Sequence, residues 1–258
     1  NSFTYNKEAE DQDIYHQKEE FIEEKFLDFI KISPDEYYQV RYIDTSGQEI
    51  VRVESNGERA RVVPDDELQN KSERGYFIQA MQVDRGKVYV SQLNLNQEYG
   101  EIENRGTQEI PEYVPVIRFA TPVFDVEGKK TGIVVSNIYA CNVLDQIGGC
   151  SDERSETRLI NEEGYYLIHP DKDKEFGFDL GVDDATIFSD YNELANHFFQ
   201  DVSGTVRCDC DNAHAVYHRI YPSESDQESF WILLSITNKD QLFSILNAEW
   251  KSFLFLSV

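Results

Sequence analysis

The pattern of apolar and polar positions predicts one long helix over residues 7–32. Within it, apolar residues follow one another at intervals of seven, four and three positions: Tyr15, Ile22, Phe26 and Phe29. These intervals place the side chains on one face of an α-helix, and the opposite surface is rich in Asp and Glu. Ser33-Pro34 ends the helix, because proline has no backbone N–H to donate. We expect the C-terminal half of the helix to pack on the protein; pairing with a second helix is the alternative.

Short strands arranged in hairpins follow the helix. Tyr37–Asp44 and Glu49–Glu54 flank a glycine-containing turn, which predicts a first hairpin. A single strand is predicted over Lys87–Leu93, after an Arg-Gly turn. Tyr113–Phe124 and Thr131–Tyr139 form a second hairpin around another glycine-containing turn. The first half of the chain therefore contains five predicted strands with antiparallel connections.

The second half of the chain repeats the first. Arg41-Tyr-Ile-Asp-x-x-Gly-x-x-Ile-Val-Arg52 recurs as Arg158-Leu-Ile-Asn-x-x-Gly-x-x-Leu-Ile-His169, with the same Arg-to-Gly interval. The remaining predicted elements of this half are a helix, a strand and an apolar return strand: Asp190–Phe199, Gly204–Cys208 and Phe230–Ile236. We therefore predict an α+β fold with a long N-terminal helix and two tandem modules. Each module has a five-stranded antiparallel sheet flanked by helices.

The patterns also predict where the domains begin and end. We expect an N-terminal helix over residues 1–34, a first module over residues 35–148 and a second over residues 149–238. Residues 239–258 carry apolar side chains at helical spacing and end in an apolar run. We expect this last helix to lead to a transmembrane segment, so that flanking transmembrane helices lie outside the sequence at both ends. The chain itself has no run of 18 apolar residues.

Charge narrows the possible partners. The 24 basic and 49 acidic residues give a formal charge of −25. Such a surface repels nucleic acid backbones and anionic lipid headgroups, so neither is an expected partner. The simplest explanation of this negative charge is that it keeps the protein soluble. A hydrophobic content of 40 % is sufficient for packed cores.

Motifs for catalysis and metal binding are missing from the sequence. There is no nucleophile elbow, no glycine-rich phosphate loop and no HExxH, so we expect no enzymatic activity in this region and no cofactor. The histidines and cysteines do not combine at zinc-site spacing. Disulfides are possible in an oxidising compartment, but their pairing is left open among four cysteines: Cys141, Cys150, Cys208 and Cys210.

The clearest candidate for binding chemistry is the short turn Arg74-Gly75-Tyr76-Phe77. Arginine offers a planar fork of donors that matches a carboxylate, and adjacent aromatic rings can form the walls of a pocket. The alternative is that Arg74 is a surface ion-pair partner and that Tyr76 and Phe77 belong to the core.

Taken in order, three phrases resemble the double Cache sensor domains, which are tandem PAS-like modules outside the membrane in prokaryotic histidine kinases and chemoreceptors. The phrases are Arg41-Tyr-Ile-Asp-x-x-Gly-x-Glu-Ile-Val-Arg-Val53, Ala120-Thr-Pro-Val-Phe-Asp-x-x-Gly128 with Gly132-Ile-Val-Val135, and Gly164-Tyr-Tyr-Leu-Ile-His-Pro-Asp171. The resemblance covers essentially the whole chain. It implies a membrane-distal first module that binds a small molecule and a membrane-proximal second module that relays the signal.

The resemblance also implies site residues. Amino-acid-binding members hold the ligand carboxylate with an Arg-x-Trp-Tyr phrase, to which Arg74-Gly-Tyr-Phe77 is similar. They place an Asp for the ligand amine where this sequence has Asn137, and a neutral amide cannot supply that charge. We therefore expect a small carboxylate without an amine, or one that bears an amide. The candidate ligand contacts are Arg74, Tyr76, Phe77, Tyr89, Asn94, Arg118 and Asn137.

The function implied is the extracytoplasmic sensor domain of a two-component histidine kinase that forms a homodimer in the intact protein. One alternative is the same domain on a methyl-accepting chemoreceptor. A second alternative is a module without a ligand, which only dimerises or sets spacing. A pocket in the folded domain, or a melting temperature that rises with ligand, would distinguish a sensor from this last class.

Overall fold

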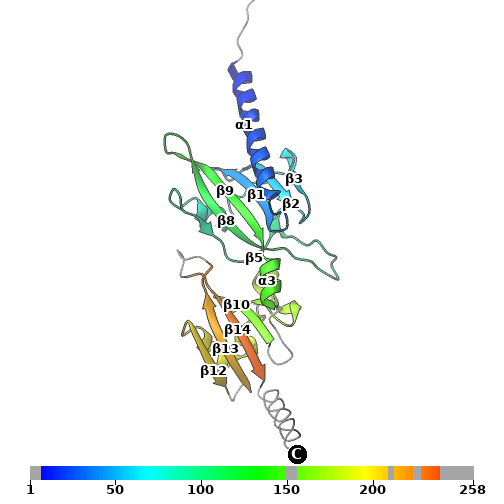
Figure 1. Ribbon diagram of the computed structural model, residues 1–258, viewed down its shortest axis with the longest axis vertical. Helices are drawn as coiled ribbons and strands as arrows, with labels where there is room; N and C mark the ends of the chain where they lie inside the picture. The colour runs from blue at the N-terminus through cyan, green and yellow to red at the C-terminus, as the bar shows by residue number, and fades with distance from the viewer. Residues whose placement is uncertain (1–6, 149–155, 209–211, 223–227, 239–258) are drawn as a thin grey trace, which may run out of the picture. The chain divides into compact units, whose positions relative to one another are not determined.

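The structure is a computed structural model that describes residues 7–148, 156–208, 212–222 and 228–238. The chain divides into two compact units, Asn1–Ala140 and Cys141–Val258 (Figure 1). Each is an α+β structure on an antiparallel sheet, which confirms the predicted fold class. The predicted helix over residues 239–258 lies outside the described residues, as do two of the four cysteines, Cys150 and Cys210. Among the described helices, none is both long enough and apolar enough to span a bilayer.

The predicted N-terminal helix is present as α1, Lys7–Ile30, and ends two residues before the predicted end. Ile30 is fully buried against Val40 and Val53 of the sheet, and Phe26 and Leu27 pack around them. Towards the other end of the helix, Tyr15 is 53 % exposed. The prediction that the C-terminal half of this helix packs on the protein is therefore confirmed.

The first unit contains a seven-stranded sheet, where five strands were predicted. After α1 its elements are β1 (Tyr37–Asp44), β2 (Glu49–Ser55), β3 (Ala60–Val62), the 3-10 helix η1 (Asp65–Glu67), α2 (Gly75–Ala80), β4 (Tyr89–Val90), β5 (Asn94–Leu95), β6 (Gln97–Glu98), β7 (Glu101–Ile102), β8 (Pro115–Phe124) and β9 (Lys130–Tyr139). The strand order is β3-β2-β1-β9-β8-β4, and β5 also pairs with β8. β6 and β7 form a separate two-stranded ribbon. Both predicted hairpins, β1–β2 and β8–β9, are present.

The predicted strand Lys87–Leu93 is wrong in its extent. Val90 pairs with Phe119 of β8, and Asn94 pairs with Val116. Between these two pairs lie three residues on the first side and two on β8, so the first side has one extra residue. Between these pairs the Ser91 hydroxyl accepts the N–H of Arg118 at 2.9 Å. The side chain thus replaces a backbone acceptor, and the extra residue interrupts the strand as a bulge does. Two short strands, β4 and β5, result.

The second unit repeats the sheet of the first. Its elements are α3 (Cys141–Gly148), β10 (Glu156–Asn161), β11 (Tyr166–Ile168), the 3-10 helix η2 (Lys172–Lys174), α4 (Gly177–Leu180), α5 (Ile187–Asp190), α6 (Asn192–Phe198), β12 (Ser203–Cys208), β13 (Ala213–Ile220) and β14 (Trp231–Asn238). The order β11-β10-β14-β13-β12 matches β2-β1-β9-β8-β4, strand for strand. In both units the first strand therefore lies between the second and the last. The predicted helix over residues 190–199 is divided between α5 and α6.

The glycine shared by the two repeats has a structural cause. Gly47 and Gly164 have φ values of +84° and +88°, in the left-handed region that favours glycine. A Cβ on Gly47 would also lie 2.5 Å from the Cα of Ser72, which is backbone and cannot rotate away. Both hairpin turns thus need glycine at this position.

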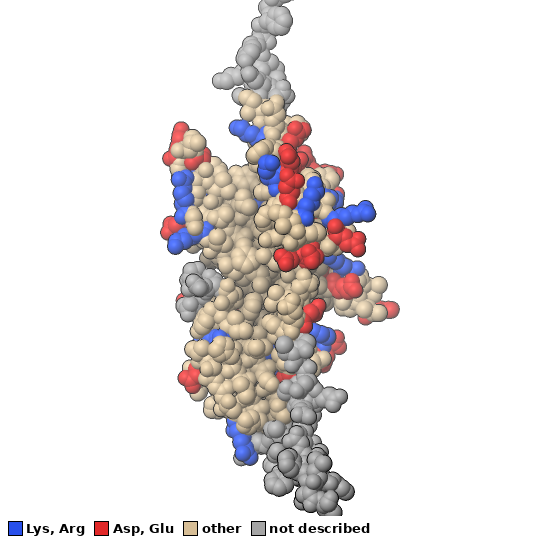
Figure 2. Space-filling model, viewed as in Figure 1, with Lys and Arg blue, Asp and Glu red and all other residues tan. Residues whose placement is uncertain are grey.

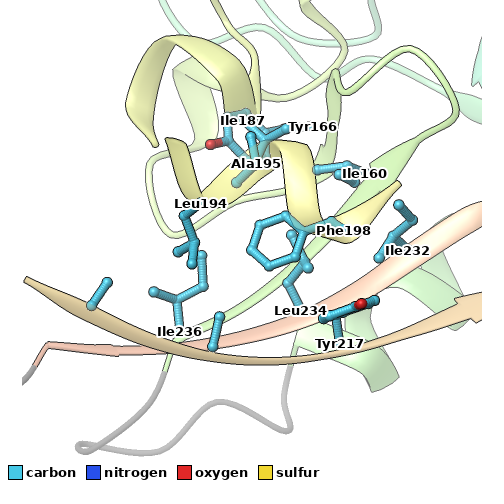
Figure 3. Packing of buried hydrophobic residues seen from close by; sticks show 12 residues of the cluster. Ile160, Tyr166, Ile187, Leu194, Ala195, Phe198, Tyr217, Ile232, Leu234 and Ile236 are labelled. Atoms are coloured by element: carbon cyan, nitrogen blue, oxygen red, sulfur yellow. The ribbon is translucent and has the colours of Figure 1, made fainter. Parts of the chain in front are cut away.

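The core of the second unit is apolar and packs between α6 and the sheet. Phe198 lies at its centre in Figure 3, with Leu194 and Ala195 from the same helix. Ile232, Leu234 and other strand residues face them from the sheet, and the Phe198 and Tyr217 rings meet edge to face at 5.3 Å. Burial of aliphatic and aromatic side chains stabilises this unit.

Candidate ligand-binding site

Three neighbouring strands of the first unit place polar residues in one row on the inner face of the sheet. The register pairs Gln39 of β1 with Asn137 of β9, and Asn137 with Arg118 of β8. Arg41 lies on the same face as Gln39, because side chains alternate along a strand. All four side chains are 2 % exposed or less. We call these residues the polar row: Gln39, Arg41, Arg118 and Asn137.

Hydrogen bonds link the polar row across the strands. Arg41 donates from Nη1 to Glu49 Oε1 at 3.1 Å and from Nη2 to Asn137 Oδ1 at 2.8 Å. The Asn137 amide donates in turn to Gln39 Oε1 at 3.1 Å and to Asn96 Oδ1 at 3.3 Å. Buried polar groups are tolerated when they are paired in this way. The network holds each side chain in one orientation.

Arg118 differs from Arg41 in its partners. Its guanidinium donates from Nη1 to Asn94 Oδ1 at 2.5 Å and from Nη2 to Asn96 Oδ1 at 3.1 Å. Both acceptors are neutral amides, and no carboxylate among the described residues forms an ion pair with it. Burial, followed by the nearby charge of Arg41, lowers the pKa of Arg118 to about 10. The fold therefore holds a desolvated positive charge here without a counter-ion.

Tyr76 projects from α2 onto this pair of arginines. The guanidinium carbons of Arg41 and Arg118 lie 5.7 and 5.2 Å from the centre of its ring, which is the geometry of cation–π contacts. The Tyr76 side chain is buried, and its hydroxyl has no hydrogen-bond partner in the described part of the chain. An unpaired buried hydroxyl is unfavourable, so it is available to a ligand atom.

Arg74 lies at the N-terminal cap of α2, where the backbone is extended and the helix has not begun. Its guanidinium donates to Gln97 Oε1 at 2.5 Å and is partly exposed. The same residue lines a surface hollow of about 510 Å³ with other polar groups: Gln69, Asn70, Lys71, Ser72, Glu73, Gln97 and Gly100. Arg74 can therefore be reached from solvent, whereas Arg118 cannot.

Two carboxylates balance the charges beside the polar row. Glu49 lies within 3.4 Å of both Arg41 and Arg52, and Glu98 accepts from Lys71 at 3.2 Å and Arg52 at 3.3 Å. Burial would raise the pKa of Glu98, but the charges of Arg41, Lys71 and Arg52 hold it far below its usual range. Burial and the charge of Arg41 lower the pKa of Lys71. Both carboxylates are thus fully occupied by cations.

The seven predicted ligand contacts fall into two groups. Tyr76, Asn94, Arg118 and Asn137 meet in the network around the polar row, with Arg74 beside it. Phe77 and Tyr89 pack in the adjoining apolar cluster with Ile43, Ala120 and Ile133, and the Tyr76 ring belongs to this cluster as well. The sequence-based search missed several residues of the network: Gln39, Arg41, Glu49, Lys71, Asn96 and Glu98. The alternation of β1 could have indicated Gln39 and Arg41, since both share a face with buried Ile43.

The second unit has no equivalent arrangement among its described residues. Arg158, which occupies the position of Arg41 in the repeat, donates to Glu156 at 2.6 Å and lies over the Tyr191 ring. His169 takes the position of Arg52, and burial lowers its pKa. In neither unit do the described residues form a group of His, Cys, Asp or Glu able to hold a metal ion.

Comparison with known proteins assigns this architecture to a family. A family model described as bacterial histidine kinase, sensor domain, matches residues 9–232. None of the curated proteins matches the chain.

Solved structures with the same fold include sensor domains from several bacteria. A domain of a sensory box/GGDEF family protein from Vibrio parahaemolyticus is 17 % identical with a TM-score of 0.71, and the match covers 92 % of this chain and 86 % of that one. The extracellular domain of a protein described as a histidine kinase, vpHK1S-Z8, is 20 % identical with a TM-score of 0.65, and the match covers 81 % of this chain and 71 % of that one. A third structure is the ligand-binding domain of the amino-acid chemoreceptor PctC of Pseudomonas aeruginosa in complex with GABA. It is 14 % identical with a TM-score of 0.50, and the match covers 80 % of this chain and 76 % of that one.

Proposed function

The chain belongs to the bacterial histidine kinase sensor domain family, and from this premise we propose that its first unit binds a small carboxylate and its second unit relays the event. Members of this family act in signal transduction outside the cytoplasm, and the matched region is a sensor rather than a catalytic domain. The observation that carries the proposal is Arg74, a guanidinium beside a hollow that is held by an amide and not by a carboxylate.

Arg74 suits a carboxylate because its planar fork can donate two parallel hydrogen bonds. Its guanidinium donates a hydrogen bond to the neutral amide oxygen of Gln97. A carboxylate would replace this acceptor with a charged one, and charge-assisted hydrogen bonds are about twice as strong as neutral ones. A protein of charge −25 repels anions at long range, so a locally positive site is needed for capture.

An α-amino acid fits this site less well than a carboxylate without an amine. Asn137 is uncharged, and its amide already bonds Arg41, Gln39 and Asn96. The two nearby carboxylates, Glu49 and Glu98, are engaged with arginines and a lysine. A desolvated ammonium group would therefore lack a counter-ion here. The GABA complex of PctC supports a small carboxylate as ligand, and the amine is the part for which we find no partner.

A thermal-shift screen of small carboxylates tests the proposal. A ligand that binds only the folded state stabilises it by about 2.7 kcal/mol at a hundredfold excess over Kd. Arg74→Ala should remove most of the resulting shift and leave the unliganded melting temperature nearly unchanged, because Arg74 is partly exposed and forms no ion pair among the described residues. Arg158→Ala, in the second unit, should keep the full shift.

Two outcomes would contradict this assignment. A strong fall in the unliganded melting temperature of Arg74→Ala would identify Arg74 as a structural residue. A ligand-induced shift that survives the substitution would place the binding site elsewhere. A chain that responds to no carboxylate would favour the alternative of a module without a ligand.

We propose a kinase in preference to a chemoreceptor as the parent protein because the matching family model describes histidine kinases.

We also propose that the intact protein is a homodimer in which two chains pair through α1. On the face shown in Figure 2, acidic and basic side chains crowd around this helix, while Phe21 remains 59 % exposed. Acidic residues outnumber basic ones along α1, so two copies of the helix repel each other. The isolated chain should therefore associate weakly, and its association should increase as salt screens this repulsion. Sedimentation at about 0.05 M and about 0.5 M salt should show the dimer fraction rising.

Phe21→Ser should abolish that pairing, because it removes an exposed apolar contact on the helix. Val126→Ser, at a fully exposed position in the β8–β9 turn, is the matched control and should not change it. Tight pairing that is insensitive to salt, or to Phe21→Ser, would contradict pairing through α1.

A further inference from the structure

A second hollow in the first unit, of about 570 Å³, lies where β2 ends and β3 begins. It shares no lining residue with the hollow beside Arg74. Three arginines line it: Arg59 from the β2–β3 turn, Arg61 from β3 and Arg105 from the loop after β7. In a chain of charge −25, three guanidinium groups at one hollow are a local concentration of positive charge.

The two carboxylates that line the same hollow are already engaged. Glu54 accepts from Arg61 through one oxygen at 2.9 Å, and its other oxygen lies 3.6 Å from Arg52. Glu103 accepts from Arg105 through one oxygen at 2.8 Å, and its other oxygen accepts two further hydrogen bonds. Neither carboxylate has an oxygen without a donor or cation beside it, so the hollow suits a cationic ligand poorly.

The polar groups that the hollow leaves unused are donors. Arg59 is exposed, and its guanidinium has no partner among the described residues. The Asn56 side-chain oxygen accepts the backbone N–H of Arg59 at 2.9 Å, which leaves the NH₂ end of this amide available. Arg61 and Arg105 bond their acceptors through Nε and Nη2, so Nη1 of each has no acceptor in the described part of the chain. A ligand that fits these groups has to supply acceptors.

Arg105 is the fixed member of the three arginines. Its guanidinium carbon lies 4.9 Å from the centre of the Tyr38 ring and 5.4 Å from that of the Tyr139 ring, and Nη2 donates to the Tyr139 hydroxyl at 3.1 Å. A guanidinium held in this way loses little conformational freedom when a ligand binds. Arg59 lies on an exposed turn without a partner, so its side chain can adjust to the ligand.

We propose that this hollow binds a tetrahedral oxyanion, the phosphate or sulfate group of a small organic molecule, between Arg59 and Arg105. A carboxylate offers two oxygens in one plane, whereas a phosphate or sulfate monoester offers three terminal oxygens that point in different directions. The latter matches donors that come from three separate segments of the chain. A volume of about 570 Å³ lies in the range of small-molecule sites, which leaves room for the organic part. This site goes beyond the proposed function, since Arg74 takes no part in it.

Titration of the whole chain with phenyl phosphate, phenyl sulfate and benzoate, followed by ¹H–¹⁵N NMR at constant ionic strength, tests this. The three probes share one ring and differ in the anionic group. Backbone resonances of residues 56–60 and 105 should follow one of the two esters with an affinity about tenfold higher than for benzoate. Arg59→Ala should weaken ester binding about tenfold, the loss expected of one charge-assisted hydrogen bond.

The matched control is Arg85→Ala, which removes an exposed guanidinium that lies over the Phe124 ring and does not line this hollow. It changes the net charge equally and should leave ester affinity nearly unchanged. Equal weakening by both variants would reduce the effect to general attraction and overturn the proposal.

The remaining outcomes also decide. Benzoate that binds these residues as tightly as the esters would overturn the proposal, as would an absence of shifts at residues 56–60. Phenyl phosphate that binds more tightly at about pH 7.5 than at about pH 5 would support it and assign a phosphate group, because the second proton leaves near pH 6. Tighter binding of phenyl sulfate, independent of pH, would support it and assign a sulfate group. Failure here leaves the carboxylate site at Arg74 untouched, because that site is tested by its own variant.

Discussion

Replacing Glu49 with glutamine should lower the free energy of unfolding of the first unit by about 3–5 kcal/mol. Glu49 is 1 % exposed and accepts from Arg41 at 3.1 Å, from Arg52 at 3.4 Å and from the backbone N–H of Gln69 at 2.9 Å. Glutamine keeps the shape of the side chain and removes its charge. Arg52 keeps Glu98 at 3.3 Å, but Arg41 loses the one carboxylate that it contacts in the described part of the chain. An uncompensated buried charge is among the costliest defects in a protein.

The matched control is Glu67→Gln. Glu67 pairs with Arg61 at 3.1 Å, but both side chains are at least 40 % exposed, so its loss should cost about 0–1 kcal/mol. Urea titration followed by circular dichroism measures both variants. Tryptophan fluorescence reports separately on the second unit, since both tryptophans of the sequence follow residue 140 and Trp231 lies in β14. A Glu49→Gln variant as stable as Glu67→Gln would show that the buried ion pairs contribute little.

The architecture could be predicted because its signals are local. The period of α1, the glycine turns of the hairpins and the Arg-to-Gly interval of the repeat all lie within short stretches of sequence. The repeat was the most informative of them, since two modules of one pattern should share one sheet topology, and they do. The interruption between β4 and β5 could not be foreseen, because it depends on a hydroxyl of Ser91 bonding the backbone of Arg118.

The candidate site was predictable only in part. Arg74, Tyr76, Arg118 and Asn137 were found from residue type and from a family resemblance. Phe77 and Tyr76 both belong to the apolar cluster, but adjacent side chains on a helix point about 100° apart, and of the two only Tyr76 also contacts the guanidinium groups of the polar row. Which charges are paired could not be predicted at all. Arg41 and Asn137, which share a hydrogen bond, lie 96 positions apart, and only the sheet register brings them together.

Replacing Arg118 with methionine should have the opposite effect to the loss of Glu49, raising the unliganded free energy of unfolding by about 1–4 kcal/mol. Methionine has a similar length and no charge to desolvate. Arg118 gives up no carboxylate partner, and Asn96 keeps a donor from Asn137. Burial and the charge of Arg41 lower the pKa of Arg118 to about 10, so the folded state holds this proton less tightly than the unfolded state. The charge therefore opposes folding at every pH below about 10.

Because Arg118 stays charged in both states below that pH, the gain from Arg118→Met should be the same from about pH 5 to about pH 9. Arg41→Met is the matched control. Arg41 is equally buried and lies over the same Tyr76 ring, but it pairs with Glu49, so its loss should destabilise the first unit strongly. Urea titrations of both variants across this pH range provide the measurement. Stabilisation by Arg118→Met would show that the chain keeps this buried charge at the expense of stability. Destabilisation by both variants would instead show that Arg118 supports the fold.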